Sequence, residues 1–169
     1  MRRITFFARP VLLLLPAVLF HGCYSFRGVS LDPSIQSYYI TPFANNAENA
    51  LPSLAQTLED ALREKIRTES RLVYNDSEPD IEFRGTLVDY RISAEAPRTG
   101  EVTAINRLTI TLAIEYFNNQ TEKQVWKRNF SFFYDFPSDR DFSSIESDAL
   151  RTISAQLMED IFNAAFSDW

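Results

Sequence analysis

The strongest constraint on the fold is a strict alternation of apolar and polar residues in the second half of the chain. In the segment NRLTITLAIEYFN, every second residue is apolar: Leu108, Ile110, Leu112, Ile114 and Tyr116. The segment VWKRNFSFFYDF places aromatic residues on one face in the same way: Trp126, Phe130, Phe132, Tyr134 and Phe136. Because successive side chains of a strand point to opposite faces, each segment is predicted to be a strand with one apolar face. Antiparallel strands of this kind form sheets that are solvated on one side.

An upstream segment, DIEFRGTLVDYRIS, predicts a third long strand whose alternation changes phase. Its apolar positions are first Ile81, Phe83, Gly85 and Leu87, and then Val88, Tyr90 and Ile92. A slip of one residue moves side chains to the other face, so we expect a β-bulge between Gly85 and Val88. A shorter β-rich segment at residues 36–43 comes earlier in the chain.

Two segments with helical periodicity provide the cover for the apolar face. In residues 52–69 the apolar stripe is Leu51, Leu54, Leu58, Ala61, Leu62 and Ile66, and the opposite polar face is Gln56, Glu59, Arg63 and Arg67. Near the C-terminus the stripe is Ile145, Ala149, Leu150, Ile153, Leu157, Ile161 and Ala164. Ser143 and Glu146 have the spacing of a capping box at its start. We predict an α+β fold, with two helices packed on one face of a roughly four-stranded mixed, mostly antiparallel sheet. The strand before the first helix and the strand after it are expected to run parallel.

The N-terminus has the pattern of a secretory signal peptide. Three arginines precede the apolar run VLLLLPAVLF, which is shorter than the ~20 residues that span a bilayer. Gly22 and Cys23, the only cysteine, follow directly. This order resembles a lipobox, so residues 1–22 are predicted to be a removed lipoprotein signal peptide and Cys23 the site of lipid attachment, with palmitate among its acyl chains. The alternatives are cleavage elsewhere beside an incidental cysteine, or an uncut anchor, because Phe20 and His21 depart from the usual lipobox.

Behind the signal peptide, we expect a lipidated cysteine with its tether at residues 23–35 and a single domain at residues 36–169. Stable membrane attachment requires more than one hydrophobic signal, which a triacylated cysteine supplies. The only histidine, His21, lies in the signal peptide. The remaining chain therefore has no Ser-His-Asp triad and no HExxH zinc site. The sequence predicts a membrane-attached protein that is not an enzyme and has no cofactor.

The charge balance and the carboxylates give no support for nucleic-acid binding or for catalysis. The net charge is −6, which is unfavourable for binding nucleic acid, and we expect no such partner. Dense carboxylates occur at Asp76, Glu78 and Asp80, and again at Asp135, Asp139 and Asp141. Such groups could bind Ca²⁺ or act as an acid–base pair. Both groups fall where turns and helix starts are expected, and there the main interpretation is bonding to nearby backbone N–H groups.

The polar face of the predicted sheet contains exposed aromatic residues. Phe117, Val125 and Phe133 fall on the outward positions of two neighbouring strands. If they cluster, they form a partner surface; if they are separate, they are ordinary exposed apolar residues. The other outward residues of these strands are Arg107, Thr109, Thr111, Glu115, Lys127, Asn129 and Ser131.

Several segments together resemble a known family. GCYSFRG, NRLTITLAIEYFN, FSFFYDF and LMEDIFNAAFSDW are similar to segments of the Bacteroidetes branch of the LptE family, the lipopolysaccharide-assembly lipoproteins. The resemblance implies two helices against a four-stranded mixed sheet. It also implies an outer-membrane lipoprotein, facing the periplasm, that plugs and helps to assemble the β-barrel translocon LptD and contacts lipopolysaccharide.

The resemblance also suggests where partners bind. In other branches, basic residues at one end of the sheet contact lipopolysaccharide, and Arg98 and Lys123, each near a hairpin tip, are our candidates here. The barrel-facing candidates are Arg107, Thr109, Thr111, Phe117, Lys127, Ser131 and Phe133. Surface-exposed lipoproteins of Bacteroidetes resemble one another in an acidic cluster after the cysteine. Tyr24–Arg27 lacks one, which favours the periplasmic side. The alternative is an unrelated periplasmic lipoprotein that acts as a scaffold or small-ligand carrier.

Overall fold

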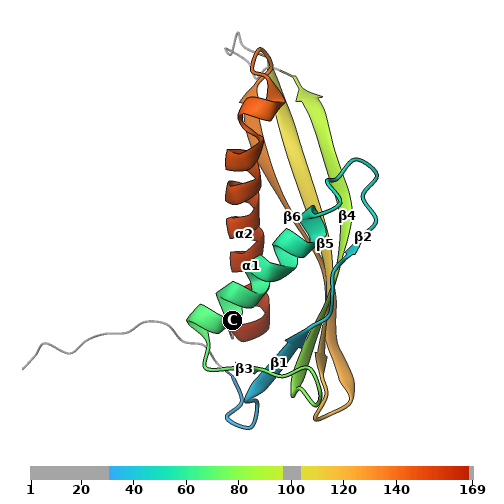
Figure 1. Ribbon diagram of the computed structural model, residues 1–169, viewed down its shortest axis with the longest axis vertical. Helices are drawn as coiled ribbons and strands as arrows, with labels where there is room; N and C mark the ends of the chain where they lie inside the picture. Colours follow the sequence, from blue (N-terminus) through green and yellow to red (C-terminus); the bar gives the residue numbers. More distant parts are fainter. Residues whose placement is uncertain (1–30, 97–103, 168–169) are drawn as a thin grey trace, which may run out of the picture.

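The computed structural model describes residues 31–96 and 104–167 of the chain (Figure 1). In chain order, its elements are β1 (Ser37–Ile40), β2 (Ala44–Asn45), α1 (Leu54–Glu69), β3 (Val73–Tyr74), β4 (Ile81–Glu95), β5 (Ile105–Asn118), β6 (Lys123–Pro137), the short 3₁₀ helix η1 (Phe142–Ser144) and α2 (Glu146–Phe166).

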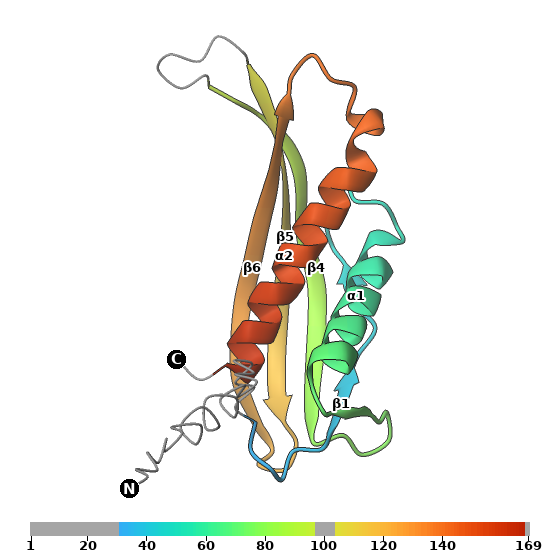
Figure 2. The same cartoon turned by 90° about the vertical axis from the view of Figure 1, so that its left-hand side faces the viewer.

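The strands form one mixed sheet in the order β3-β1-β4-β5-β6, and β2 pairs with β4 beyond β1. The long strands β4, β5 and β6 are antiparallel, whereas β1 runs parallel to both β3 and β4. The strands before and after the first helix were predicted to run parallel, and this is confirmed. Figure 2 shows both helices on the same face of the sheet, side by side. The predicted α+β class is therefore confirmed.

The core lies between this sheet face and the two helices. All five inward residues predicted for β5 are buried, from Leu108 to Tyr116. Leu58 and Leu62 of α1 and Ile153 and Leu157 of α2 pack against them as part of one cluster. Because each of these helical residues is almost fully shielded from water, hydrophobic burial holds both helices onto the sheet.

The predicted β-bulge occurs in β4. The register with β5 shifts between Leu87 and Asp89, which leaves Val88 as the extra residue. Tyr90 is buried after the shift, as expected, but Val88 and Ile92 are 39% and 45% exposed. Val88 has no partner in the register. Ile92 lies towards the far end of β4, which continues past the start of α1 in Figure 2.

The start of α2 differs from the prediction. The capping box between Ser143 and Glu146 is not formed, because residues 142–144 make the 3₁₀ helix η1. Asp141 caps this turn instead: its carboxylate accepts a hydrogen bond from the backbone N–H of Ser143 over 3.2 Å. Phe142, at the centre of the change, packs against Phe136, with ring centroids 5.7 Å apart. The chain therefore enters α2 through a short turn that is capped by Asp141 and packed against the core through Phe142.

The polar face of α1 also contains an exception. Glu59 was predicted to be exposed, and that prediction is wrong: the residue is only 8% exposed. Its carboxylate accepts a hydrogen bond from the backbone N–H of Phe43 and forms an ion pair with Arg63. The ring of Phe43 packs directly over Gly85 of β4, where a Cβ atom would overlap it. The chain between β1 and β2 thus connects the helix to the sheet.

Candidate functional site: the outward face of the sheet

The outward face of β5 and β6 carries a ladder of polar pairs. Register places Thr111 opposite Ser131, and their hydroxyl oxygens lie 2.9 Å apart. Glu115 lies opposite Lys127, with 2.6 Å between Oε1 and Nζ. Direct cross-strand neighbours of opposite charge stabilise a sheet modestly. The residues that the sequence placed on this face are therefore brought together, and these two pairs connect β5 to β6.

Arg107 is the most connected residue of this face. Its guanidinium donates two hydrogen bonds to the opposite Asp135, over 2.6 Å and 2.8 Å, and these bonds raise the pKa of Arg107 above its ordinary value. The same guanidinium lies 3.8 Å from the ring centroid of Phe133. A cation over a ring face is attracted by the negative centre of the ring. Phe133 remains 44% exposed, so the pair is available to a partner.

A second arginine–aromatic pair lies at the other end of the ladder. Arg84 of β4 lies 4.3 Å from the ring centroid of Phe117 and is hydrogen-bonded to Glu82 over 2.8 Å. Phe133 lies opposite Thr109, eight residues before Phe117 along β5. At about 3.4 Å per residue, this separates the two positions by roughly 27 Å. Phe117 and Phe133 therefore do not form one apolar patch; each is a separate aromatic residue covered by its own arginine.

Of the candidate lipopolysaccharide contacts and the lipid-attachment site, only Lys123 lies within the described residues. Lys123 is exposed at the start of β6. Arg98 lies outside the described residues, but the strands on either side of its hairpin, which end at Glu95 and begin at Ile105, meet at the opposite end of β5 from Lys123. Cys23 and the signal peptide also lie outside the described residues.

Of the predicted carboxylates, Asp80 and Asp141 bond to backbone N–H groups of turns, whereas Asp135 lies within β6 and pairs with Arg107. The side chain of Gln120 and the backbone N–H groups of Gln36 and Ser37 donate hydrogen bonds to Asp80. These bonds lower the pKa of Asp80 to about 2. In residues 31–96 and 104–167, no three His, Cys, Asp or Glu side chains gather in a way that could hold a metal ion.

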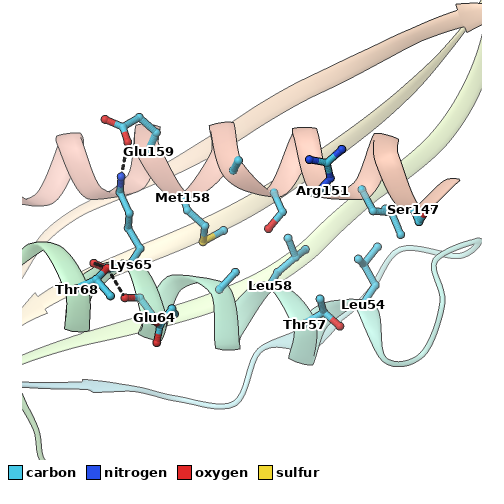
Figure 3. A pocket seen from close by; sticks show the side chains of 14 residues that line it. Leu54, Thr57, Leu58, Glu64, Lys65, Thr68, Ser147, Arg151, Met158 and Glu159 are labelled. Atoms are coloured by element: carbon cyan, nitrogen blue, oxygen red, sulfur yellow. Dashed lines mark hydrogen bonds and ion pairs between the residues drawn. The ribbon is translucent and has the colours of Figure 1, made fainter. Parts of the chain in front are cut away.

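A groove between the two helices was not foreseen from the sequence. It has a volume of about 760 Å³ and runs along the solvent side of α1 and α2, with Leu58, Ala61 and Met158 among its lining residues (Figure 3). An ion pair between Lys65 and Glu159 bridges the two helices beside it. Its residues follow the helical repeat of both elements, so the sequence signal was present but indistinguishable from that of a core stripe.

A comparison with known protein families shows to which family the chain belongs. The family model for lipopolysaccharide assembly, LptE, matches residues 35–165. The chain belongs to the LptE family. The match runs from just before β1 through nearly all of α2. The family region of this LptE-family protein therefore contains the whole described sheet, all of α1 and all but the last residue of α2. No helix in the described part of this LptE-family protein is long and apolar enough to cross a membrane.

Solved structures of low sequence identity share the fold of this LptE-family protein. A Xanthomonas campestris protein matches with a TM-score of 0.55 and 13% identity, over 82% of this chain and 90% of its own. A hypothetical protein from Chlamydia trachomatis matches with a TM-score of 0.53 and 5% identity, over 77% and 97%. A minor lipoprotein from Acinetobacter baumannii matches with a TM-score of 0.50 and 13% identity, over 75% and 90%. Among curated proteins, no sequence matches significantly.

Proposed function

We propose that this protein is an outer-membrane lipoprotein that plugs an LptD-type β-barrel and supports its assembly for lipopolysaccharide insertion. In this proposal Cys23 carries the lipid anchor and the folded domain faces the periplasm and the barrel lumen. The domain acts by non-covalent contacts. Membership of the lipopolysaccharide-assembly family supports the process, and the outward face of the sheet supports the mode of contact.

The main support for contact with a barrel lumen through the outward face is its ladder of paired polar groups. The cations Arg107 and Lys127 already contact Asp135 and Glu115 within the domain. Burial of an ion is costly unless a partner compensates it. A face whose charges are paired internally can therefore lie against the polar wall of a barrel lumen without requiring a matching charge at every position. Phe117 and Phe133 add aromatic contacts, which often supply much of the binding energy at an interface.

Photo-crosslinking in growing cells tests the proposal. A photoreactive residue replaces Thr109 or Thr111 on the outward face, and Gln56 or Asp60 on the exposed side of α1. We expect adducts to a large outer-membrane barrel protein from the two sheet positions. If none of the four positions gives a barrel adduct while the protein is present at its normal level, the plug model is wrong.

Two further measurements test the anchor and its orientation. Intact mass of protein extracted from membranes should show a chain that begins at Cys23 and carries acyl groups, and Cys23→Ala should release the domain from membranes. An uncut N-terminus would contradict the lipobox assignment. Protease added to intact cells should leave the domain uncut until the outer membrane is opened, and cleavage in intact cells would reject the periplasmic orientation.

A further inference from the structure

Strand β6 forms an edge of the sheet and is long and weakly protected. Among the described residues it pairs only with β5, although it extends from Lys123 to Pro137. Its two ends carry features that discourage further pairing: a register irregularity near Val125, and a proline at residue 137. The centre, residues 129–134, has the sequence NFSFFY and contains no charge. An exposed edge of this type is a template for another strand.

A hollow lies beside this edge on the helix side of the sheet. It has a volume of about 490 Å³ and is lined by Phe132 of β6 and by one stripe of α2: Arg151, Thr152, Ala155, Gln156 and Glu159. Phe130, Phe132 and Tyr134 are only half-buried on this side. A strand added to the edge would direct alternate side chains into the hollow, and a helix carried by that strand would face the α2 stripe.

We propose that the occupant of this edge is a second copy of the same chain, related by a two-fold axis through Ser131 of β6. Antiparallel pairing about Ser131 places Lys127 of each copy opposite Asp135 of the other on the outward face. Lys127 is already paired with Glu115 and Asp135 with Arg107, so the new contact would extend these ion pairs across the two copies. On the helix side it places Phe130 opposite Phe132, twice. Cross-strand pairs of opposite charge and of two aromatic rings are both favourable. In this register β6 is complementary to itself.

Helix α2 is self-complementary about the same axis. If Ala155 lies at the two-fold axis, Arg151 of one copy faces Glu159 of the other, four residues on either side of the centre. Ala155 and Phe132 line the same hollow, so one axis can serve the helix and the strand together. The small side chain at the centre permits the close approach of about 8–10 Å between helix axes that packed helices require. Arg151 is 78% exposed and pairs with Asp148 of its own helix over 2.9 Å, so Glu159 of the second copy would join an existing ion pair.

The result would be an isologous dimer with one continuous sheet across both copies. Its formation requires neither a barrel nor lipopolysaccharide, so the inference goes beyond the proposed function and can fail independently of it. In copies of this chain that are not bound to another partner, the pairing would cover the aromatic edge of β6.

Disulfide trapping of the full chain, extracted from membranes in detergent, tests the register. In Ser131→Cys the two introduced thiols would face each other across the axis, within the range of ~4.5–5.5 Å between Cβ atoms of directly opposite residues. Mild oxidation should convert most of this variant into a covalent dimer on a non-reducing gel. The parent chain, which contains only Cys23, gives the baseline. Labelling of the introduced thiol with a maleimide before oxidation confirms that it is accessible.

Two matched variants make the test specific. Thr111→Cys lies on the same face one strand inward, where its copies would be about three strand spacings, or roughly 14 Å, apart. Asn129→Cys lies on the edge but four residues from its counterpart, again roughly 14 Å. Both should stay at the baseline. A dimer from Asn129→Cys in place of Ser131→Cys, or no dimer above baseline from a Ser131→Cys variant whose thiol is accessible, would overturn the proposal.

A charge change on α2 tests the helix contact. Arg151→Glu would place two carboxylates together at each end of the α2 pair, so the yield of the Ser131→Cys dimer should fall about tenfold or more. Arg140→Glu makes the same change at an exposed position before η1 and should leave the yield unchanged. Equal yields in both variants would contradict the α2 contact.

Discussion

The backbone N–H of Phe43 donates a hydrogen bond to the carboxylate of Glu59 over 3.3 Å, in a contact shielded from water. The same carboxylate forms an ion pair with Arg63, and the Phe43 ring lies over Gly85 of β4. One acidic side chain of α1 therefore holds the chain segment between β1 and β2 in place against the sheet. This buried acceptor is costly to remove because the N–H of Phe43 loses its partner, whereas Arg63 keeps its ion pair with Asp60.

We predict that Glu59→Ala lowers the free energy of unfolding by about 1–3 kcal/mol, since it leaves the buried N–H of Phe43 unpaired. Glu59→Gln keeps an acceptor oxygen and should cost less. The matched control is Asp60→Ala, which removes an exposed ion pair to the same Arg63 and should change stability by about 0.5 kcal/mol or less. Urea denaturation of the three variants makes the comparison, and equal losses for Glu59→Ala and Asp60→Ala would contradict the role of Glu59.

The burial of Glu59 could not be predicted from the helical periodicity of α1. Helical periodicity placed Leu58 and Leu62 correctly on the buried face, because a large apolar side chain has one favourable environment. Glu59 borders that stripe, and its burial depends on Phe43, which reaches it from a connection that has no periodicity. Gly85 carried a signal in retrospect: a strand residue without a side chain often marks the close approach of another group.

The packing of the helices on the sheet gives a second prediction. Leu58 is 1% exposed and Ile153 is fully buried, and both belong to the core cluster. Replacing either by alanine removes apolar contacts and leaves a cavity, so each should cost about 2–5 kcal/mol. Leu51→Ala, at a position that is 46% exposed, is the control and should have little effect. Thermal melts of both core variants that coincide with that of the parent would reject the helix-on-sheet packing.

The hydrogen bonds to Asp80 predict a dependence of stability on pH. Because the folded state lowers the pKa of Asp80 to about 2, its ionised form stabilises the fold above the unfolded pKa of 3.8. This contribution is lost as the pH falls from about 4 towards 2. Asp80 is only half-buried, and solvent screening reduces the contribution to about 1 kcal/mol. Asp80→Asn should lower stability at pH 7 and flatten its pH dependence below pH 4. Parallel curves for parent and variant over this range would refute the assignment.

The outward face could be predicted as a set of residues but not as an arrangement. Strict alternation in β5 and β6 identified Thr111, Lys127 and Ser131 as outward residues. Only the register of the two strands shows that Thr111 pairs with Ser131 and that Lys127 pairs with Glu115. The sequence could not settle whether Phe117 and Phe133 meet, because their separation depends on the pairing offset between β5 and β6. The edge of β6 was likewise invisible, since which strand is terminal is a property of the sheet order and not of any one segment.

The arginine–aromatic pairs of the outward face give the last prediction. Phe117 lies under Arg84, on the face that we propose to contact the barrel, and its ring is not part of the core cluster. Phe117→Ala should therefore change the unfolding free energy by less than about 1 kcal/mol, while it reduces the amount of barrel protein that copurifies from native membranes, because aromatic residues often dominate interface energy. Val73→Ala removes a 68% exposed apolar residue from the short strand β3 at the opposite edge and should leave copurification unchanged. If Phe117→Ala and Val73→Ala retain the barrel equally, Phe117 does not anchor the complex, and the contact must rest on the polar ladder from Arg107 to Lys127.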